Sequence, residues 1–154
     1  MSILRTALVF IATVLVGTVL VSIANTHVVL QSLSAVGADF PTAVRLDAMK
    51  RDLLGFGPTL FVVVLIGFAI AFPVAGWIPR LLGQPWRRIG FTLAGGAAVA
   101  CIMIAITAYY GEALHSTITP VASSRTLPGL LSLALAGAAA GLLFSLLKPA
   151  ARPA

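Results

Sequence analysis

The chain has 154 residues, of which 60% are hydrophobic and 9% are charged, and its mean hydropathy is +1.09. Soluble domains are about one-quarter charged, so this composition excludes a water-soluble domain and predicts a protein embedded in lipid. The net charge of +6 comes from basic residues that stand singly or in pairs without interleaved aromatic residues, which excludes nucleic-acid binding. The length fits about four membrane spans of roughly 20 residues each, in one transmembrane domain over residues 1–154.

The first predicted span covers residues 4–25, an apolar run with Arg5 near its start. An outer loop is expected over residues 26–57. The first part of this loop, residues 28–40, is mildly apolar. The pattern leaves open whether this part lies in the membrane interface or re-enters the bilayer.

A short amphipathic helix is predicted later in the same loop, over residues 42–54. Three apolar residues share one helical face: Leu46, Met49 and Leu53. On the wet face, Asp47 stands four residues before Arg51, a spacing that favours an ion pair. We expect this helix to rest on the membrane surface.

Three further spans are predicted, over residues 58–78, 89–110 and 128–147. With the N-terminus inside, the cytoplasmic side receives Arg5, Arg80, Arg87, Arg88, Lys148 and Arg152, and the outer side receives Arg45, Lys50, Arg51 and Arg125. The acidic residues all fall on the outer side: Asp39, Asp47, Asp52 and Glu112. The excess of cations predicts that both termini are cytoplasmic, in an all-α integral membrane four-helix bundle of the bacterial inner membrane.

The interiors of the predicted spans carry no Asp, Glu, Lys, Arg or His. Because ionisable groups at mid-membrane mark proton and ion pathways, their absence argues against proton-coupled transport by this chain alone. The single cysteine, Cys101, excludes an intramolecular disulfide, a CxxC redox pair and a cysteine metal cluster.

Small residues recur at helical spacing in the last three spans. The positions expected at helix contacts are Gly67, Ala71, Gly96, Ala100, Gly137 and Gly141. Such ridges allow two helix backbones to approach closely. They either hold the bundle together or, in the fourth span above all, dock a partner or a second copy of the chain.

Candidate site residues gather in the outer loops, where both charge signs are present. Any polar ligand or partner site is expected to draw on His27, Arg45, Asp47, Arg51, Glu112, His115 and Arg125. Glu112 and His115 have a metal-ligand spacing, but no second copy of the motif exists to complete a site. The serines near His115 lack the Gly-x-Ser-x-Gly elbow, so the sequence predicts no catalytic residue and no metal site.

The sequence therefore predicts a small non-enzymatic membrane protein. Its leading role is that of an accessory or structural subunit that binds a membrane partner, another copy of itself or lipid. One alternative is a redox membrane anchor for haem or quinone, with haem held between His27 and His115. Another is a lipid-binding protein or enzyme with a site at the outer face. No cofactor is assigned.

Overall fold

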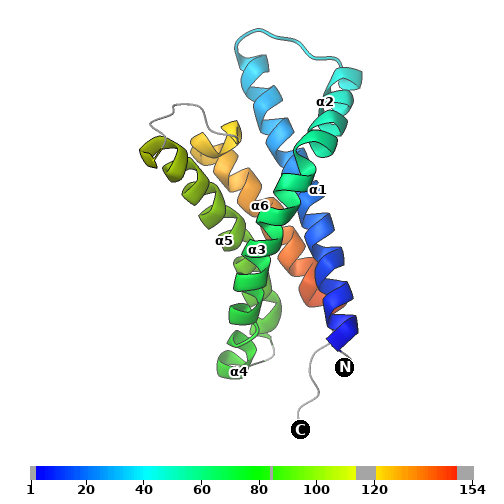
Figure 1. Cartoon of the computed structure of the whole chain (residues 1–154), viewed down its shortest axis with the longest axis vertical. Coiled ribbons are helices and arrows are strands. Elements are labelled where there is room, and N and C mark those ends of the chain that lie inside the picture. The colour runs from blue at the N-terminus through cyan, green and yellow to red at the C-terminus, as the bar shows by residue number, and fades with distance from the viewer. Residues whose placement is uncertain (1–2, 84, 114–120, 149–154) are drawn as a thin grey trace.

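The computed structural model describes residues 3–83, 85–113 and 121–148. Four helices are long and apolar enough to cross a membrane: α1 (Ile3–Ala35), α3 (Gly57–Ala75), α5 (Trp86–Ala108) and α6 (Leu127–Leu147). Four shorter elements are α2 (Thr42–Gly55), α4 (Ile78–Leu82), the π-helical η1 (Tyr109–Ala113) and the 3-10 turn η2 (Ala122–Arg125). The predicted all-α membrane four-helix bundle is confirmed (Figure 1).

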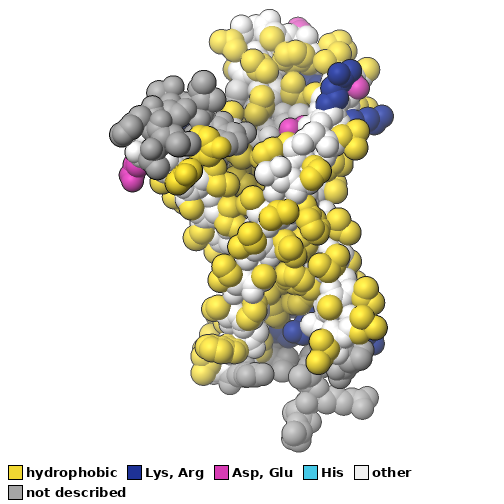
Figure 2. Space-filling model, in the orientation of Figure 1, with side chains coloured by type: hydrophobic (Ala, Val, Ile, Leu, Met, Phe, Trp, Pro, Cys, Tyr) yellow, Lys and Arg dark blue, Asp and Glu magenta, His cyan; other side chains and the backbone are white. Residues whose placement is uncertain are grey.

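The four long helices form a ring in which α5 packs on α6 and α3, and α1 packs on α6 and α3. Helix α1 begins and helix α6 ends at one end of this ring, which we call the terminal end. The opposite end, called the hairpin end, holds the loop between α1 and α2 and the turn η2 (Figure 1). Apolar side chains cover the middle of the face seen in Figure 2, whereas charged side chains lie near the two ends, as expected for a bundle surrounded by lipid.

Helix α1 is much longer than the predicted span 4–25. Its 33 residues correspond to about 50 Å, while the hydrocarbon core of a bilayer is about 30 Å thick. Residues 28–35 therefore continue the helix and form neither a loop nor a re-entrant turn. The segment after residue 25 has no Gly or Pro before Gly37, which ends the helix at φ +92°, with the Ala38 N–H donating to the Leu33 carbonyl at 3.3 Å.

The predicted helix 42–54 is present as α2, which covers Thr42–Gly55. It packs against α1, and only Phe56 separates it from the start of α3. In Figure 1 the helices α1 and α2 converge toward the bundle and spread apart toward the loop that joins them. Together they extend the molecule beyond the four-helix ring at the hairpin end.

The tightest helix crossing joins α5 and α6, where glycines face glycines. A methyl group added at Gly137 or at Gly95 would meet the backbone oxygen of the other residue. One added at Gly141 would meet the Phe91 carbonyl, and one added at Gly96 would lie 3.1 Å from the Ala134 oxygen. The glycines of the α6 ridge are therefore buried against α5 within the chain.

The contact between α3 and α5 is packed less tightly. A methyl group added at Gly67 would meet the Ile102 side chain, which is flexible and can move. Ala71 and Ala100 are half-buried, and Ala71 lines a groove between α3 and α5. Gly95, which sequence analysis did not single out, lies closer to α6 than Gly96 does.

Candidate functional site

The predicted outer residues on α2 make local contacts at the hairpin end. The Arg51 guanidinium donates to the Asp47 carboxylate at 2.7 Å, and both side chains are exposed. The Arg45 guanidinium donates to the Phe40 carbonyl at 3.2 Å and to the Ser34 hydroxyl at 3.4 Å. Arg45 thereby ties the start of α2 to the last turn of α1, which is a structural contact.

The remaining predicted outer residues lie on three different segments. His27 is exposed on α1, Glu112 is exposed in η1, and Arg125 is exposed at the end of η2. His115 lies outside the described residues, so the pairing of His27 with His115 around haem stays a prediction. Within the described ranges, no group of three or more His, Cys, Asp or Glu side chains could hold a metal ion.

A polar cluster that sequence analysis missed lies between α1, α2 and η2. The Asp52 carboxylate accepts hydrogen bonds from the Thr26 hydroxyl at 2.7 Å, the Ser22 hydroxyl at 3.4 Å and the Asn25 amide at 3.5 Å. The Ser123 hydroxyl donates to the Asn25 side-chain oxygen at 2.6 Å. These bonds clasp the α1–α2 hairpin to the turn before α6, and we call them the Asp52 clasp.

The clasp had a signal in the sequence. Ser22, Asn25 and Thr26 are spaced three and four residues apart, so they share one face of an otherwise apolar helix. Ser22 and Thr26 are buried, and a buried hydroxyl needs a hydrogen-bond partner. Hydroxyl and amide donors around one carboxylate stabilise its charge but provide no paired nucleophile and base.

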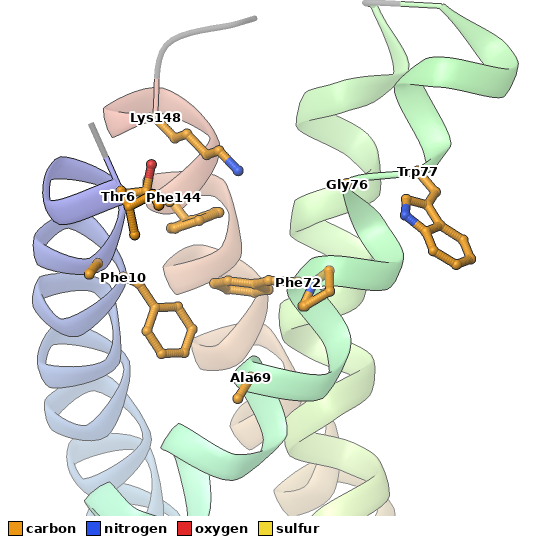
Figure 3. A pocket seen from close by; sticks show the side chains of 11 residues that line it. Thr6, Phe10, Ala69, Phe72, Gly76, Trp77, Phe144 and Lys148 are labelled. Atoms are coloured by element: carbon orange, nitrogen blue, oxygen red, sulfur yellow. The ribbon is translucent and has the colours of Figure 1, made fainter. Parts of the chain in front are cut away.

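A hollow lies at the terminal end, and we call it the terminal cavity. It has a volume of about 670 Å³ and opens between α1, the end of α3 and the end of α6 (Figure 3). Its lining consists of Ile3, Thr6, Ala7 and Phe10 from α1, Ala69, Phe72 and Pro73 from α3, Gly76 and Trp77 from the turn after α3, Phe144 from α6, and Lys148 directly after α6. Its lining is therefore mainly apolar, with few polar groups, as is usual for small-molecule pockets.

Aromatic rings form the wall of the terminal cavity. Phe72 and Phe144 are buried and stacked, with ring centroids 4.6 Å apart. Phe10 meets both rings edge-on, at 6.1 Å from Phe72 and 6.3 Å from Phe144. Phe91 meets Phe144 edge-on, with ring centroids 5.1 Å apart. Edge-to-face and offset-stacked rings fix one another's positions, so this wall is preformed.

A lysine stands over this aromatic wall. The Lys148 ammonium lies 5.4 Å from the Phe144 ring centroid and 6.0 Å from that of Phe91. The Arg87 guanidinium donates to the Lys148 carbonyl, which brings a second cation to the same place. Burial lowers the pKa of Lys148 from its ordinary value, and the nearby charge of Arg87 lowers that pKa further.

The positive charge at the terminal end is not matched by acidic side chains. All four Asp and Glu residues belong to the hairpin end, in the loop after α1, on α2 or in η1: Asp39, Asp47, Asp52 and Glu112. The terminal end carries Arg5, Arg80, Arg87, Arg88 and Lys148. The terminal cavity therefore combines an apolar aromatic wall with a cationic rim formed by Lys148 and the neighbouring Arg87.

Two other hollows have a different character. A pocket of about 420 Å³ at the hairpin end lies between α1 and η2, and Arg125 is among its lining residues. A groove of about 450 Å³ runs between α3 and α5 and is lined by apolar residues such as Ala71, Ala94 and Cys101. Neither joins an aromatic wall to a charged group as the terminal cavity does.

Sequence analysis did not find the terminal cavity because its parts are far apart in the chain. Phe10, Phe72 and Phe144 come from three different spans and each resembles an ordinary core residue. Lys148 resembled an ordinary cation beside a span. Compared with protein-family models, with curated proteins and with solved structures, the chain matches none of them.

Proposed function

We propose that this chain is a small non-enzymatic membrane protein that binds one amphiphilic lipid in the terminal cavity. The observation that carries the proposal is the aromatic wall formed by Phe10, Phe72 and Phe144. This wall lines a cavity that opens between three spanning helices, next to Lys148. An apolar wall accommodates an acyl chain, and a charged rim at the helix ends lies where a lipid headgroup lies.

The charge pattern supports a place for this cavity in the membrane. The cations of the terminal end favour a cytoplasmic position, so the cavity would face the cytoplasmic leaflet of a bacterial inner membrane. The polar side chains of its lining are the Thr6 hydroxyl, the Trp77 indole N–H and the Lys148 ammonium. This set suits the binding of a headgroup, since each of the three groups can donate a hydrogen bond to a phosphate oxygen.

A cavity-filling substitution tests this proposal. Ala69 is exposed and lines the cavity, so Ala69→Phe places a ring where the acyl chain would lie. The matched control is Ala12→Phe, which adds the same ring to an exposed position of α1 outside the cavity lining. Native mass spectrometry of protein extracted from membranes measures the number of lipids retained by each variant.

We expect one retained lipid on the wild type and on Ala12→Phe, and loss of that lipid in Ala69→Phe. Equal retention by all three proteins, or no retained lipid on the wild type, would overturn the proposal. If Ala69→Phe fails to fold, Thr6→Phe fills the cavity from α1 and gives the same comparison.

A further inference from the structure

We infer that the terminal cavity selects phospholipids whose headgroup carries a net negative charge, with Lys148 contacting the phosphate and Arg87 strengthening the local positive field. This inference rests on the proposed lipid binding and adds the class of ligand. The positive charges of Lys148 and Arg87 at the cavity rim carry this inference. The apolar lining accounts for the binding of a lipid but not for a preference among headgroups.

The acyl chain cannot supply much selectivity in this site. The cavity opens among membrane-spanning helices, and the surrounding lipid tails are as apolar as its own wall. A chain that moves from the bilayer into the cavity therefore gains little hydrophobic free energy. The difference in affinity between two lipids with the same chains must come from their headgroups.

The headgroup position is set by Lys148. Its ammonium lies over the faces of Phe144 and Phe91, which hold it at the rim of the cavity. In Figure 3 this side chain extends from the end of α6 toward the space between the helices. An acyl chain that lies along the aromatic wall would bring its phosphate to this ammonium.

The end of α6 does not neutralise both cations. A helix C-terminus carries roughly half a negative charge on its last carbonyls, which favours a nearby lysine. Here the Arg87 guanidinium donates to the Lys148 carbonyl at the end of α6, so Arg87 already uses one of these acceptors. Because every acidic side chain lies at the hairpin end, an anionic headgroup suits Lys148 and Arg87 as a counter-ion.

The preference for an anionic headgroup is measured with two lipids that share the same acyl chains. Phosphatidylglycerol has a net negative charge, and phosphatidylcholine has none. Each is titrated against the whole protein in detergent, and native mass spectrometry gives the apparent affinity. The variants are Lys148→Gln, Lys148→Arg and Arg87→Gln. Lys50→Gln is the matched control, because Lys50 is an exposed lysine of α2 at the hairpin end.

We expect the wild type to bind phosphatidylglycerol about tenfold more tightly than phosphatidylcholine, a difference of about 1.4 kcal/mol. Lys148→Gln should lose most of this preference, Arg87→Gln should lose part of it, and Lys148→Arg and Lys50→Gln should keep it. An unchanged preference in Lys148→Gln overturns the inference. Equal loss in Lys50→Gln also overturns it, because the effect would then be general surface charge.

Inorganic phosphate distinguishes a lipid from a free anion. We expect millimolar phosphate to leave phosphatidylglycerol bound, and its displacement by phosphate alone would overturn the assignment to a lipid. If the wild type binds both lipids equally and Ala69→Phe binds neither, the headgroup inference fails while the proposed function stands. If the wild type binds neither lipid, the proposed function itself fails.

Discussion

Replacement of Gly141 by alanine adds a single methyl group at the closest point between α5 and α6. This methyl group would meet the Phe91 carbonyl oxygen and would lie 2.9 Å from the Phe91 carbonyl carbon and 3.3 Å from the Gly95 Cα. All these atoms belong to the backbone of α5, which cannot move aside as the end of a side chain can. The two helices must therefore separate over the length of their crossing.

Two opposing effects determine how much Gly141→Ala changes the stability of the protein. Overpacking of a well-packed contact costs typically 1–3 kcal/mol, and the separation also removes dispersion contacts along the crossing. The better helix propensity of alanine offsets about 1 kcal/mol of this cost. Because the clash is with backbone atoms, we take the upper part of the range and expect Gly141→Ala to destabilise the protein by about 2 kcal/mol.

Thermal unfolding in detergent measures this effect, with Gly55→Ala as the matched control. A methyl group added at Gly55 meets no atom within 4 Å, so only helix propensity acts there. We expect Gly55→Ala to leave the Tm unchanged or to raise it slightly, and Gly141→Ala to lower it by roughly 4–8 °C. If Gly141→Ala is as stable as the control, α6 does not cross α5 at this glycine and the described packing is wrong.

Three further predictions concern the hairpin end, the cap of α6 and the orientation. Asp52→Ala should destabilise the α1–α2 hairpin by about 1–3 kcal/mol, measured as faster hydrogen exchange in α2. Asp47→Ala should change the stability by less than about 1 kcal/mol, because the ion pair of Asp47 with Arg51 is exposed. Equal effects of the two variants would contradict the clasp. Thr126→Ala removes the hydroxyl that accepts from the Gly129 N–H, and it should lower the stability by about 1 kcal/mol in the same thermal assay. An unchanged Tm would show that Thr126 does not cap α6. A cysteine placed at Gln84 should resist an impermeant thiol reagent added outside intact cells, and labelling from outside would reverse the proposed orientation.

Hydropathy was sufficient to predict four spans because lipid imposes one strong requirement on every spanning helix. A run of about 20 apolar residues is needed, and the backbone must satisfy its own hydrogen bonds. Local signals also predicted the helix over residues 42–54, which the structure contains as α2. These features depend on residues close together in the chain.

The end of α1 could not be placed by hydropathy, because polarity marks the membrane boundary and does not end a helix. Residues 26–35 leave the most apolar stretch but contain no helix breaker, and Gly37 ends the helix. A search for glycine and proline, in addition to apolar length, would have located this end.

The site depends on contacts between distant parts of the chain, which periodicity does not reveal. The prediction that a polar site uses the outer loops followed from where acids and cations occur together. It did not consider that a cation can pair with an aromatic wall, as Lys148 does with Phe144. Likewise, Gly95 and Gly96 are both small, and only the direction of α6 shows that Gly95 lies closer to α6 than Gly96 does.

The central claim, that a lipid chain occupies the terminal cavity, is tested most directly by photolabelling. A phosphatidylglycerol that carries a diazirine in its acyl chain is bound to the whole protein and irradiated, and the labelled residues are identified by mass spectrometry. We predict that labels concentrate on the lining of the cavity, at Phe10, Ala69, Phe72 and Phe144, and that Ala69→Phe removes them. Labels spread evenly over the lipid-facing surface, or confined to the groove between α3 and α5, would contradict the claim.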